Sequence, residues 1–279
     1  MKKLLTKHIF WFGVCLIAGA IASMTYLGFS PHTFKTQDEG KPLALASNVI
    51  IQKSAEPSLI ASYQTVQIGR STSDVSITAT RYGQGEKFVL VLGGIHGNEP
   101  SSVRLAKALD KSLEQNYQSN KLAIIVVSVV NPDGCSVGTR VNARGVDINR
   151  NFPSISWRRE ATKSRYNPGN AAASEPETQA IINLISQYNP VLIISIHAPF
   201  ACVNWDGPAD YAAGLISQLA GYPLKPSLGY ETPGSLGAYA GVDRKIPIVT
   251  LELRAVETDE QIEKNIKALR TLFLCISDF

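Results

Sequence analysis

The sequence predicts an α/β protein with three layers, in which helices cover both faces of a mixed, largely parallel central sheet. Apolar runs rich in β-branched residues have the length and composition of buried strands; they are residues 88–92, 122–130, 191–196 and 246–253. Segments with the apolar spacing of helices alternate with these runs. The chain has 279 residues, of which 44% are hydrophobic, enough for one sizeable domain with a substantial core.

Each expected helix follows one of these runs or precedes the next. The clearest helical pattern covers 101–114, where Val103, Leu105, Leu109 and Leu113 lie near helical spacing. Further helices are expected at 175–188, 209–220 and 258–275, and two weaker β patterns, 65–68 and 75–80, precede the first apolar run. A long irregular stretch runs from 135 to 173, and such stretches in compact domains are usually functional.

The first 34 residues differ from the rest of the chain. Lys2, Lys3 and Lys7 precede a stretch without charges at 9–29, and a small-residue cleavage site is offered at 20–22. The uncharged stretch is about 20 residues long, which is also enough to span a bilayer uncut. A cleaved signal peptide and a retained membrane anchor are therefore favoured equally. Both predict an exported domain, because the positive end stays inside.

These features divide the chain into a signal peptide or membrane anchor (1–34), a linker (35–62) and a globular domain (63–279). The formal net charge of +4 is modest, and no basic stripe interleaved with aromatic residues predicts nucleic-acid binding. Cys135, Cys202 and Cys275 fall in the domain, and the lack of a CxxC pair argues against a cysteine zinc site.

Two histidines and a glutamate follow predicted strands. His96 and Glu99 come soon after the run 88–92, and His197 follows 191–196. By itself the His-x-x-Glu pair is a weak signal, since it also fits a surface histidine and a helix-start glutamate. The carboxyl ends of parallel strands meet at one edge of a sheet, which favours a shared site. Two imidazoles and one carboxylate leave one zinc position open, as in catalytic centres, so we expect one Zn²⁺ per chain.

A further carboxylate interrupts the apolar run 246–253. Glu252 would be unfavourable there unless it is paired or functional. Arg244 or Arg254 could be a structural partner, but carboxylates inside strands tend to belong to sites. Asp147, in the irregular stretch, could orient a zinc-binding histidine, as carboxylates often do.

Four motifs in order resemble those of the zinc metallocarboxypeptidase family. They are GIHGNE at 94–99, GVDINRNF at 145–152, SIH at 195–197 and TLELR at 250–254, and the resemblance spans about 64–275. It implies a zinc carboxypeptidase-like fold and a zinc metallopeptidase activity, with the metal held by His96, Glu99 and His197.

The resemblance also implies roles for the other site residues. Glu252 would be the general base and Arg140 would stabilise the oxyanion. Asn149 and Arg150 would hold the substrate carboxylate next to the scissile bond, using the planar fork of the guanidinium. Tyr230 would close over the substrate.

Further segments resemble the branch of this family that cuts the γ-D-glutamyl-meso-diaminopimelate bond of peptidoglycan peptides. They are 131–135, 174–178, 201–202 and 229–235. This implies zinc-dependent hydrolysis of that amide, with peptidoglycan peptides as substrate and, given the export segment, a periplasmic location. A conventional zinc carboxypeptidase, an amino-acid deacylase on the same scaffold and an inactive cell-wall-binding module are the alternatives. Cys135 and Cys202 are each the last residue of such a segment, so we expect them to lie close together near the site and to be candidates for a disulfide.

Overall fold

A computed structural model describes residues 63–277 except 118, 120 and 162. The predictions for the signal peptide or anchor at 1–34 and for the linker at 35–62 lie outside this part of the chain. Among the described residues, no helix is long and apolar enough to cross a membrane.

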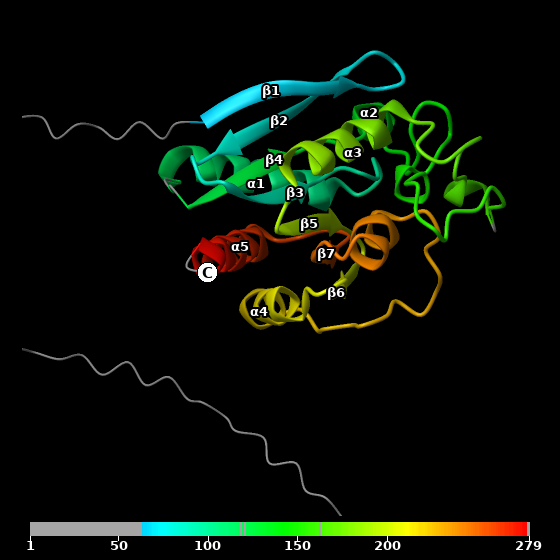
Figure 1. Cartoon of the computed structure of the whole chain (residues 1–279). Helices are drawn as coiled ribbons and strands as arrows, with labels where there is room; N and C mark the ends of the chain where they lie inside the picture. Colours follow the sequence, from blue (N-terminus) through cyan, green and yellow to red (C-terminus); the bar gives the residue numbers. More distant parts are fainter. Residues whose placement is uncertain (1–62, 118, 120, 162, 278–279) are drawn as a thin grey trace, which may run out of the picture. The chain divides into compact units, whose positions relative to one another are not determined.

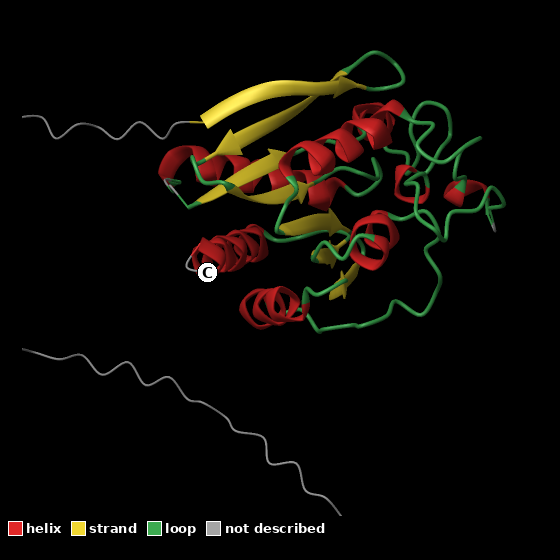
Figure 2. Cartoon of the chain, viewed as in Figure 1, coloured by secondary structure: helices red, strands yellow, loops and turns green. Residues whose placement is uncertain are grey.

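A seven-stranded mixed sheet forms the middle of the domain (Figures 1 and 2). Its strands, in spatial order, are β1 (Tyr63–Arg70), β2 (Ser76–Tyr82), β4 (Leu122–Val127), β3 (Lys87–Leu92), β5 (Leu192–His197), β7 (Ile248–Arg254) and β6 (Phe200–Asp206). The four middle strands β4, β3, β5 and β7 are parallel, whereas β1 and β2 at one edge and β6 at the other are antiparallel to their neighbours.

Helices cover both faces of this sheet. One face packs against α1 (Pro100–Asn116), α4 (Asp210–Ala220) and α5 (Asp259–Ser277), and the other against α3 (Pro176–Tyr188) and the π-helix η3 (Gly237–Asp243). A hydrophobic core lies on each face of the sheet, and β3 contributes to both. Val89 and Val91 point into the core beneath α1, α4 and α5, and Leu90 and Leu92 point into the core beneath α3 and η3. Successive strand side chains point to opposite faces, so an uninterrupted apolar run suits a strand covered on both sides. The predicted three layers are present.

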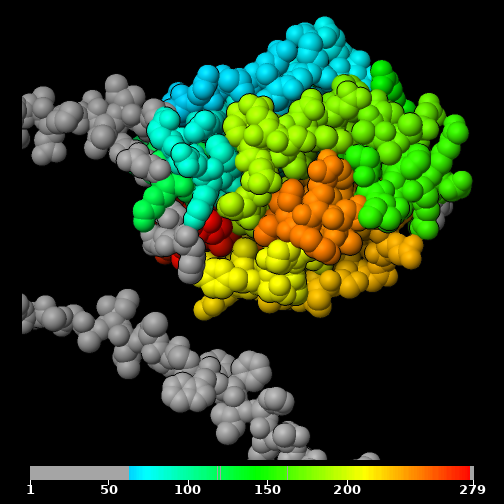
Figure 3. Space-filling view, viewed as in Figure 1, coloured from blue at the N-terminus to red at the C-terminus, as the bar shows by residue number. Residues whose placement is uncertain are grey.

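Short helices lie in the stretch of chain between β4 and α3. They are α2 (Pro132–Val137), η1 (Ile148–Arg150) and η2 (Ser164–Tyr166). Figure 3 shows the orange segment around η3 bordered by the green loop that carries η1 and η2 and by the yellow segment of β6 and α4.

Strand β6, the π-helix η3 and the short helices α2, η1 and η2 were not predicted. Strand β6 is a partly exposed edge strand that contains Asn204 and Asp206, so it lacks an uninterrupted apolar run. The π-helix η3 contains Gly237 and Gly241, and glycine disfavours helices. Strand β7 begins two residues later than expected, after Pro247, which has no N–H to donate to a sheet.

The expected disulfide is wrong, because Cys135 and Cys202 are both free thiols. Cys135 lies in α2, with its thiol 3.9 Å from the carbonyl oxygen of Gly94 just after β3. Cys202 lies in β6 at the sheet edge, and β5 and β7 separate β6 from β3. Neighbouring strands lie about 4.8 Å apart, which places the two residues beyond the reach of a disulfide.

Candidate metal centre and active site

The residues predicted to form the site lie at the carboxyl ends of three adjacent parallel strands. His96 and Glu99 follow β3, His197 is the last residue of β5, and Glu252 lies near the end of β7. His197 and Glu252 are direct partners in the β5–β7 register. The sheet therefore brings residues from distant parts of the sequence to one edge.

The loop that carries His96 and Glu99 has a tightly defined backbone. A Cβ at Gly97 would lie 1.9 Å from the carbonyl carbon of Gly134, so only glycine fits there. Glu99 is the N-cap residue of α1, followed by Pro100, and its carbonyl oxygen accepts hydrogen bonds from the backbone and hydroxyl of Ser102. The capping position leaves the Glu99 carboxylate free to turn toward the histidines.

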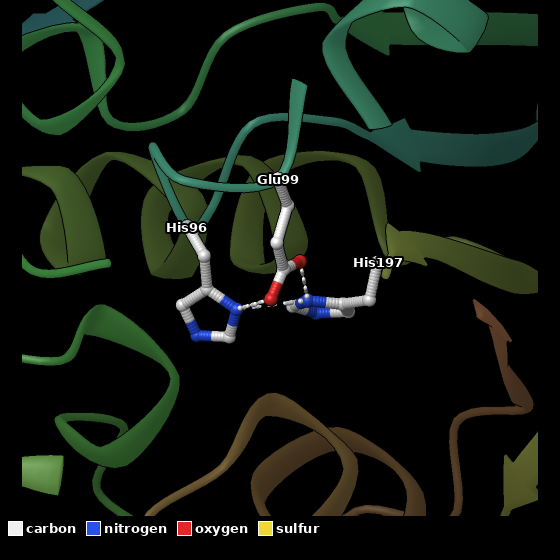
Figure 4. Close-up of side chains that lie close together, drawn as sticks. All are labelled: His96, Glu99 and His197. Atoms are coloured by element: carbon white, nitrogen blue, oxygen red, sulfur yellow. Dashed lines mark hydrogen bonds and ion pairs between the residues drawn. The ribbon is translucent and has the colours of Figure 1, made fainter. Parts of the chain in front are cut away.

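His96, Glu99 and His197 form a buried cluster (Figure 4). His96 Nδ1 lies 2.8 Å from Glu99 Oε1, and His197 Nδ1 lies 3.0 Å from Glu99 Oε2. The two Nδ1 atoms are themselves only 3.1 Å apart. All three side chains thus direct metal-binding atoms at one point.

Asp147 sets the orientation of the His96 ring. Its Oδ1 lies 3.0 Å from His96 Nε2, and its own side chain is completely buried. A carboxylate accepts hydrogen bonds, so the proton of the neutral ring sits on Nε2 and Nδ1 presents a lone pair to the cluster. Burial would lower the pKa of His96, but the neighbouring Glu99 and Asp147 carboxylates raise it.

This donor set fits Zn²⁺. Two imidazole nitrogens and a carboxylate are the ligands of catalytic zinc centres, and such sites leave a position open. The close approach of the two Nδ1 atoms is what a shared cation stabilises. In zinc sites, the ring nitrogen of a histidine that does not bind the metal regularly donates to a carboxylate, as His96 does to Asp147.

Glu252 is a buried carboxylate without an ion-pair partner among the described residues. Its Oε2 has no hydrogen-bond partner there, and burial raises the pKa of the carboxyl. Arg254 instead pairs with Glu257 at 3.4 Å, and the Arg244 guanidinium lies over the Tyr239 ring. The alternative of a structural ion pair with either arginine is therefore wrong.

Arg140 is anchored beside the cluster by two carboxylates. Its Nε donates to Asp147 Oδ2 at 2.9 Å, and its Nη1 lies 3.5 Å from Glu99 Oε1. The rest of the guanidinium lines the cavity in front of the cluster. Asp147 consequently fixes both a cluster histidine and this arginine.

Asn149 and Arg150 follow Asp147 in η1 and also line the cavity. The Asn149 carbonyl oxygen accepts from Arg150 Nη1 at 2.6 Å, while its side-chain Oδ1 accepts from the backbone of Leu236. Arg150 is buried, with 6% of its surface exposed, and burial lowers the pKa of its guanidinium. It has no carboxylate partner among the described residues, which leaves its charge available to a ligand.

Arg144 and Asn151, in the same irregular stretch, have structural roles. Arg144 lies 3.6 Å from Glu175. The buried Asn151 amide donates to the carbonyls of Pro168 and Ala171 and so closes the loop.

A cavity of about 530 Å³ opens in front of the cluster. Tyr230 lines it with its ring half exposed, 6.4 Å from the ring of Phe200. Residues that sequence reasoning missed line it too: Arg165, Tyr166 and Asp206. The Asp206 side chain has no hydrogen-bond or ion-pair partner among the described residues, and burial raises the pKa of its carboxyl. A polar residue at the end of an unpredicted edge strand gave no signal in the sequence.

Comparison with known proteins identifies the family. The family model described as zinc carboxypeptidase matches residues 53–214, more than half of the chain. The chain belongs to the zinc carboxypeptidase family. The predicted zinc metallopeptidase class and fold class are thereby confirmed.

Relatives agree with this membership. Murein peptide amidase A of Escherichia coli K12 is 37% identical over 194 residues, which is 66% of this chain and 78% of that protein. The protein of the same name from Vibrio campbellii is 33% identical, over 66% of this chain and 76% of its own length.

Solved structures share the fold. The murein-tripeptide amidase MpaA of Escherichia coli O157 is 31% identical with a TM-score of 0.62, covering 75% of this chain and 91% of that one. Carboxypeptidase A of Helicoverpa armigera, 18% identical, has a TM-score of 0.66 and covers 77% of this chain and 69% of its own.

Proposed function

We propose that this zinc metallopeptidase hydrolyses the γ-D-glutamyl-meso-diaminopimelate amide of peptidoglycan-derived peptides. The observation that carries the proposal is the charge pattern of the cavity. The Arg150 guanidinium has no carboxylate partner and the Asp206 carboxyl group has no hydrogen-bond or ion-pair partner among the described residues, and both groups line the cavity that the metal cluster also lines. Diaminopimelate offers a carboxylate next to the scissile amide and an ammonium group on its side chain, so it matches both.

Relatives named murein peptide amidase A and murein-tripeptide amidase support the choice of bond. A conventional carboxypeptidase for apolar residues would bring no cation to Asp206, and that carboxylate would stay unpaired in the cavity.

The chain's own residues account for the chemistry. His96, Glu99 and His197 would hold Zn²⁺, which supplies Lewis-acid activation of a carbonyl and of water. The free Oε2 of Glu252 takes the water proton and passes it to the leaving amine nitrogen. The raised pKa of this carboxyl, caused by burial, brings its basicity closer to neutral pH.

Arg140 and Arg150 act on the two charges of the substrate. Arg140, held by Asp147, donates hydrogen bonds to the oxygen that becomes negative at the scissile carbonyl. Arg150 binds the diaminopimelate carboxylate through a two-pronged hydrogen bond and so fixes the amide at a set distance from the cluster. Asn149 shares this carboxylate, and Tyr230 covers the substrate from the cavity wall.

The test compares a tripeptide that ends in diaminopimelate with the tetrapeptide that carries a further D-Ala. The extra residue converts the carboxylate bound by Arg150 into a neutral amide, so the tetrapeptide should be a poor substrate. Equal cleavage of both would contradict the role of Arg150. Release of C-terminal residues from α-linked peptides, without cleavage of the tripeptide, would favour a conventional carboxypeptidase.

We also propose that the domain (63–279) works outside the cytoplasm, in the periplasm, delivered by residues 1–34 acting as a cleaved signal peptide or as an inner-membrane anchor, with 35–62 as a linker. The support is the basic start followed by the uncharged stretch 9–29. Cell fractionation together with N-terminal sequencing of the purified protein tests this. A cytoplasmic protein that keeps residue 1 would contradict it.

A further inference from the structure

Three guanidinium groups converge on the ring of Tyr166 at the cavity. Their central carbon atoms lie 5.3 Å (Arg140), 5.2 Å (Arg150) and 4.7 Å (Arg165) from the ring centre. Such distances allow favourable cation–π contacts. Tyr166 therefore lies among three cationic side chains, of which the proposed function uses only Arg140 and Arg150.

The three arginines differ in whether a carboxylate neutralises their charge. Arg140 is paired with Asp147 and lies near Glu99. Arg150 and Arg165 have no carboxylate partner among the described residues, and the side-chain bond of Arg165 is from its Nη2 to Tyr166 Oη at 2.7 Å. Two uncompensated guanidinium groups that line one cavity suit a ligand with two anionic groups.

The proposed substrate has anionic groups on both sides of the scissile amide. On the amine side, the diaminopimelate carboxylate next to the amide is assigned to Arg150, and the second carboxylate lies at the far end of the side chain, beside the ammonium group. On the acyl side, the γ-linkage leaves the α-carboxylate of D-glutamate free, separated from the scissile carbonyl by the side-chain carbons. An α-linked peptide has no carboxylate at that place, because its α-carboxyl group is the one being cut.

We propose that Arg165, positioned by Tyr166, binds the free α-carboxylate of the D-glutamyl residue and so selects γ-linked over α-linked substrates. This inference rests on the proposed function. Tyr166 orients the Arg165 guanidinium through its hydroxyl, and its ring lies against the guanidinium groups of Arg140, Arg150 and Arg165. Arg165 is exposed to solvent, so its contribution is moderate in size.

The experiment uses two tripeptides that differ only in the D-glutamyl α-group, which is a carboxylate in one and a carboxamide in the other. With the full chain loaded with zinc, we expect kcat/KM to fall about threefold to tenfold on amidation of the peptide. Arg165→Gln should lose a similar factor on the carboxylate peptide and nothing further on the carboxamide peptide. Tyr166→Phe, which keeps the ring but lacks the hydroxyl that accepts from Arg165, should lose part of the same discrimination between the two peptides.

Arg159→Gln is the matched control, since Arg159 is an exposed arginine of the same loop that does not line the cavity. It should cleave both peptides as the wild type does. Equal cleavage of both peptides by the wild type, or an equal loss on both in Arg165→Gln, would overturn the assignment of Arg165 and leave the proposed function intact. Cleavage of neither peptide by the wild type would overturn both proposals.

Discussion

Asp147 connects a histidine of the metal cluster with an arginine of the cavity. One carboxylate oxygen accepts from His96 and from the backbone of Asn149, and the other accepts from Arg140. Burial would raise the pKa of this carboxyl, yet His96 and Arg140 hold it well below its usual range. The carboxylate is thus ionised and orients both a cluster histidine and an arginine of the cavity.

Asp147→Asn should weaken zinc binding by about 10- to 100-fold, the usual effect of losing a carboxylate behind a metal-binding histidine. The amide keeps the shape but removes the charge that fixes the His96 proton on Nε2. Competition with a zinc chelator measures the affinity. The exposed ion-paired Asp74→Asn is the control and should bind zinc normally. An unchanged affinity in Asp147→Asn would show that the ring needs no such support.

Glu252→Gln should keep its zinc and lose about 100- to 10,000-fold in kcat, because it removes a proton acceptor and not a metal ligand. The side chain has no ion pair to break, so the fold should persist. Metal analysis checks that zinc is retained, circular dichroism checks the fold, and kcat on the tripeptide measures the loss of activity. Activity within a few-fold of the wild type would place the base elsewhere.

At the scale of the elements, the loop between β3 and α1 positions two of the three cluster residues. Gly97 lies against the backbone of Gly134 at the start of α2, so this loop and α2 touch without an intervening side chain. Cys135, next to Gly134, is held by the same contact and faces β3 instead of β6.

Gly97→Ala should therefore displace the loop and lower both stability and zinc affinity. Overpacking of this kind destabilises by about 1–3 kcal/mol, and a contact with rigid backbone belongs at the upper end. Gly214→Ala is the matched control: Gly214 lies inside α4, a Cβ there meets nothing within 4 Å, and alanine should raise stability by about 0.5–1 kcal/mol. Thermal unfolding of both variants with saturating zinc tests the contrast, and equal unfolding temperatures would refute it.

The sequence predicted those elements in which apolar residues form a run or recur at regular spacing. Strands β3 and β5 consist mostly of apolar residues, and α1 carries its apolar residues on one face, so their positions follow from composition and spacing. Strand β6 and η3 lack a regular apolar pattern, so neither was predicted. Asp206 in β6 and the glycines of η3 that lie against it, Gly237 and Gly241, were therefore not recognised as part of the site. Arg165 and Tyr166 lie in an irregular loop whose path depends on Asn151 and other long-range contacts, which no local pattern encodes.

At the scale of the whole molecule, the cluster joins two halves of the sheet. His96 and Glu99 follow β3, while His197 ends β5, and the Glu99 carboxylate also accepts from the backbone of Ala198. A metal held by all three residues would link segments that are far apart in the sequence, since 101 positions separate His96 from His197. Because the ligands come together only in the folded chain, binding energy adds to the free energy of unfolding.

Removal of zinc should therefore lower the unfolding temperature of the wild type, and stoichiometric zinc should restore it. At a free zinc concentration 100 times Kd, the stabilisation is about 2.7 kcal/mol. His197→Ala loses one ligand and should lose most bound zinc and most of this difference between the zinc-loaded and chelated states. Scanning calorimetry with and without chelator measures the difference, and metal analysis gives one zinc per wild-type chain. A full zinc complement in both His96→Ala and His197→Ala would reject the cluster as the metal centre, whatever the activity of the variants.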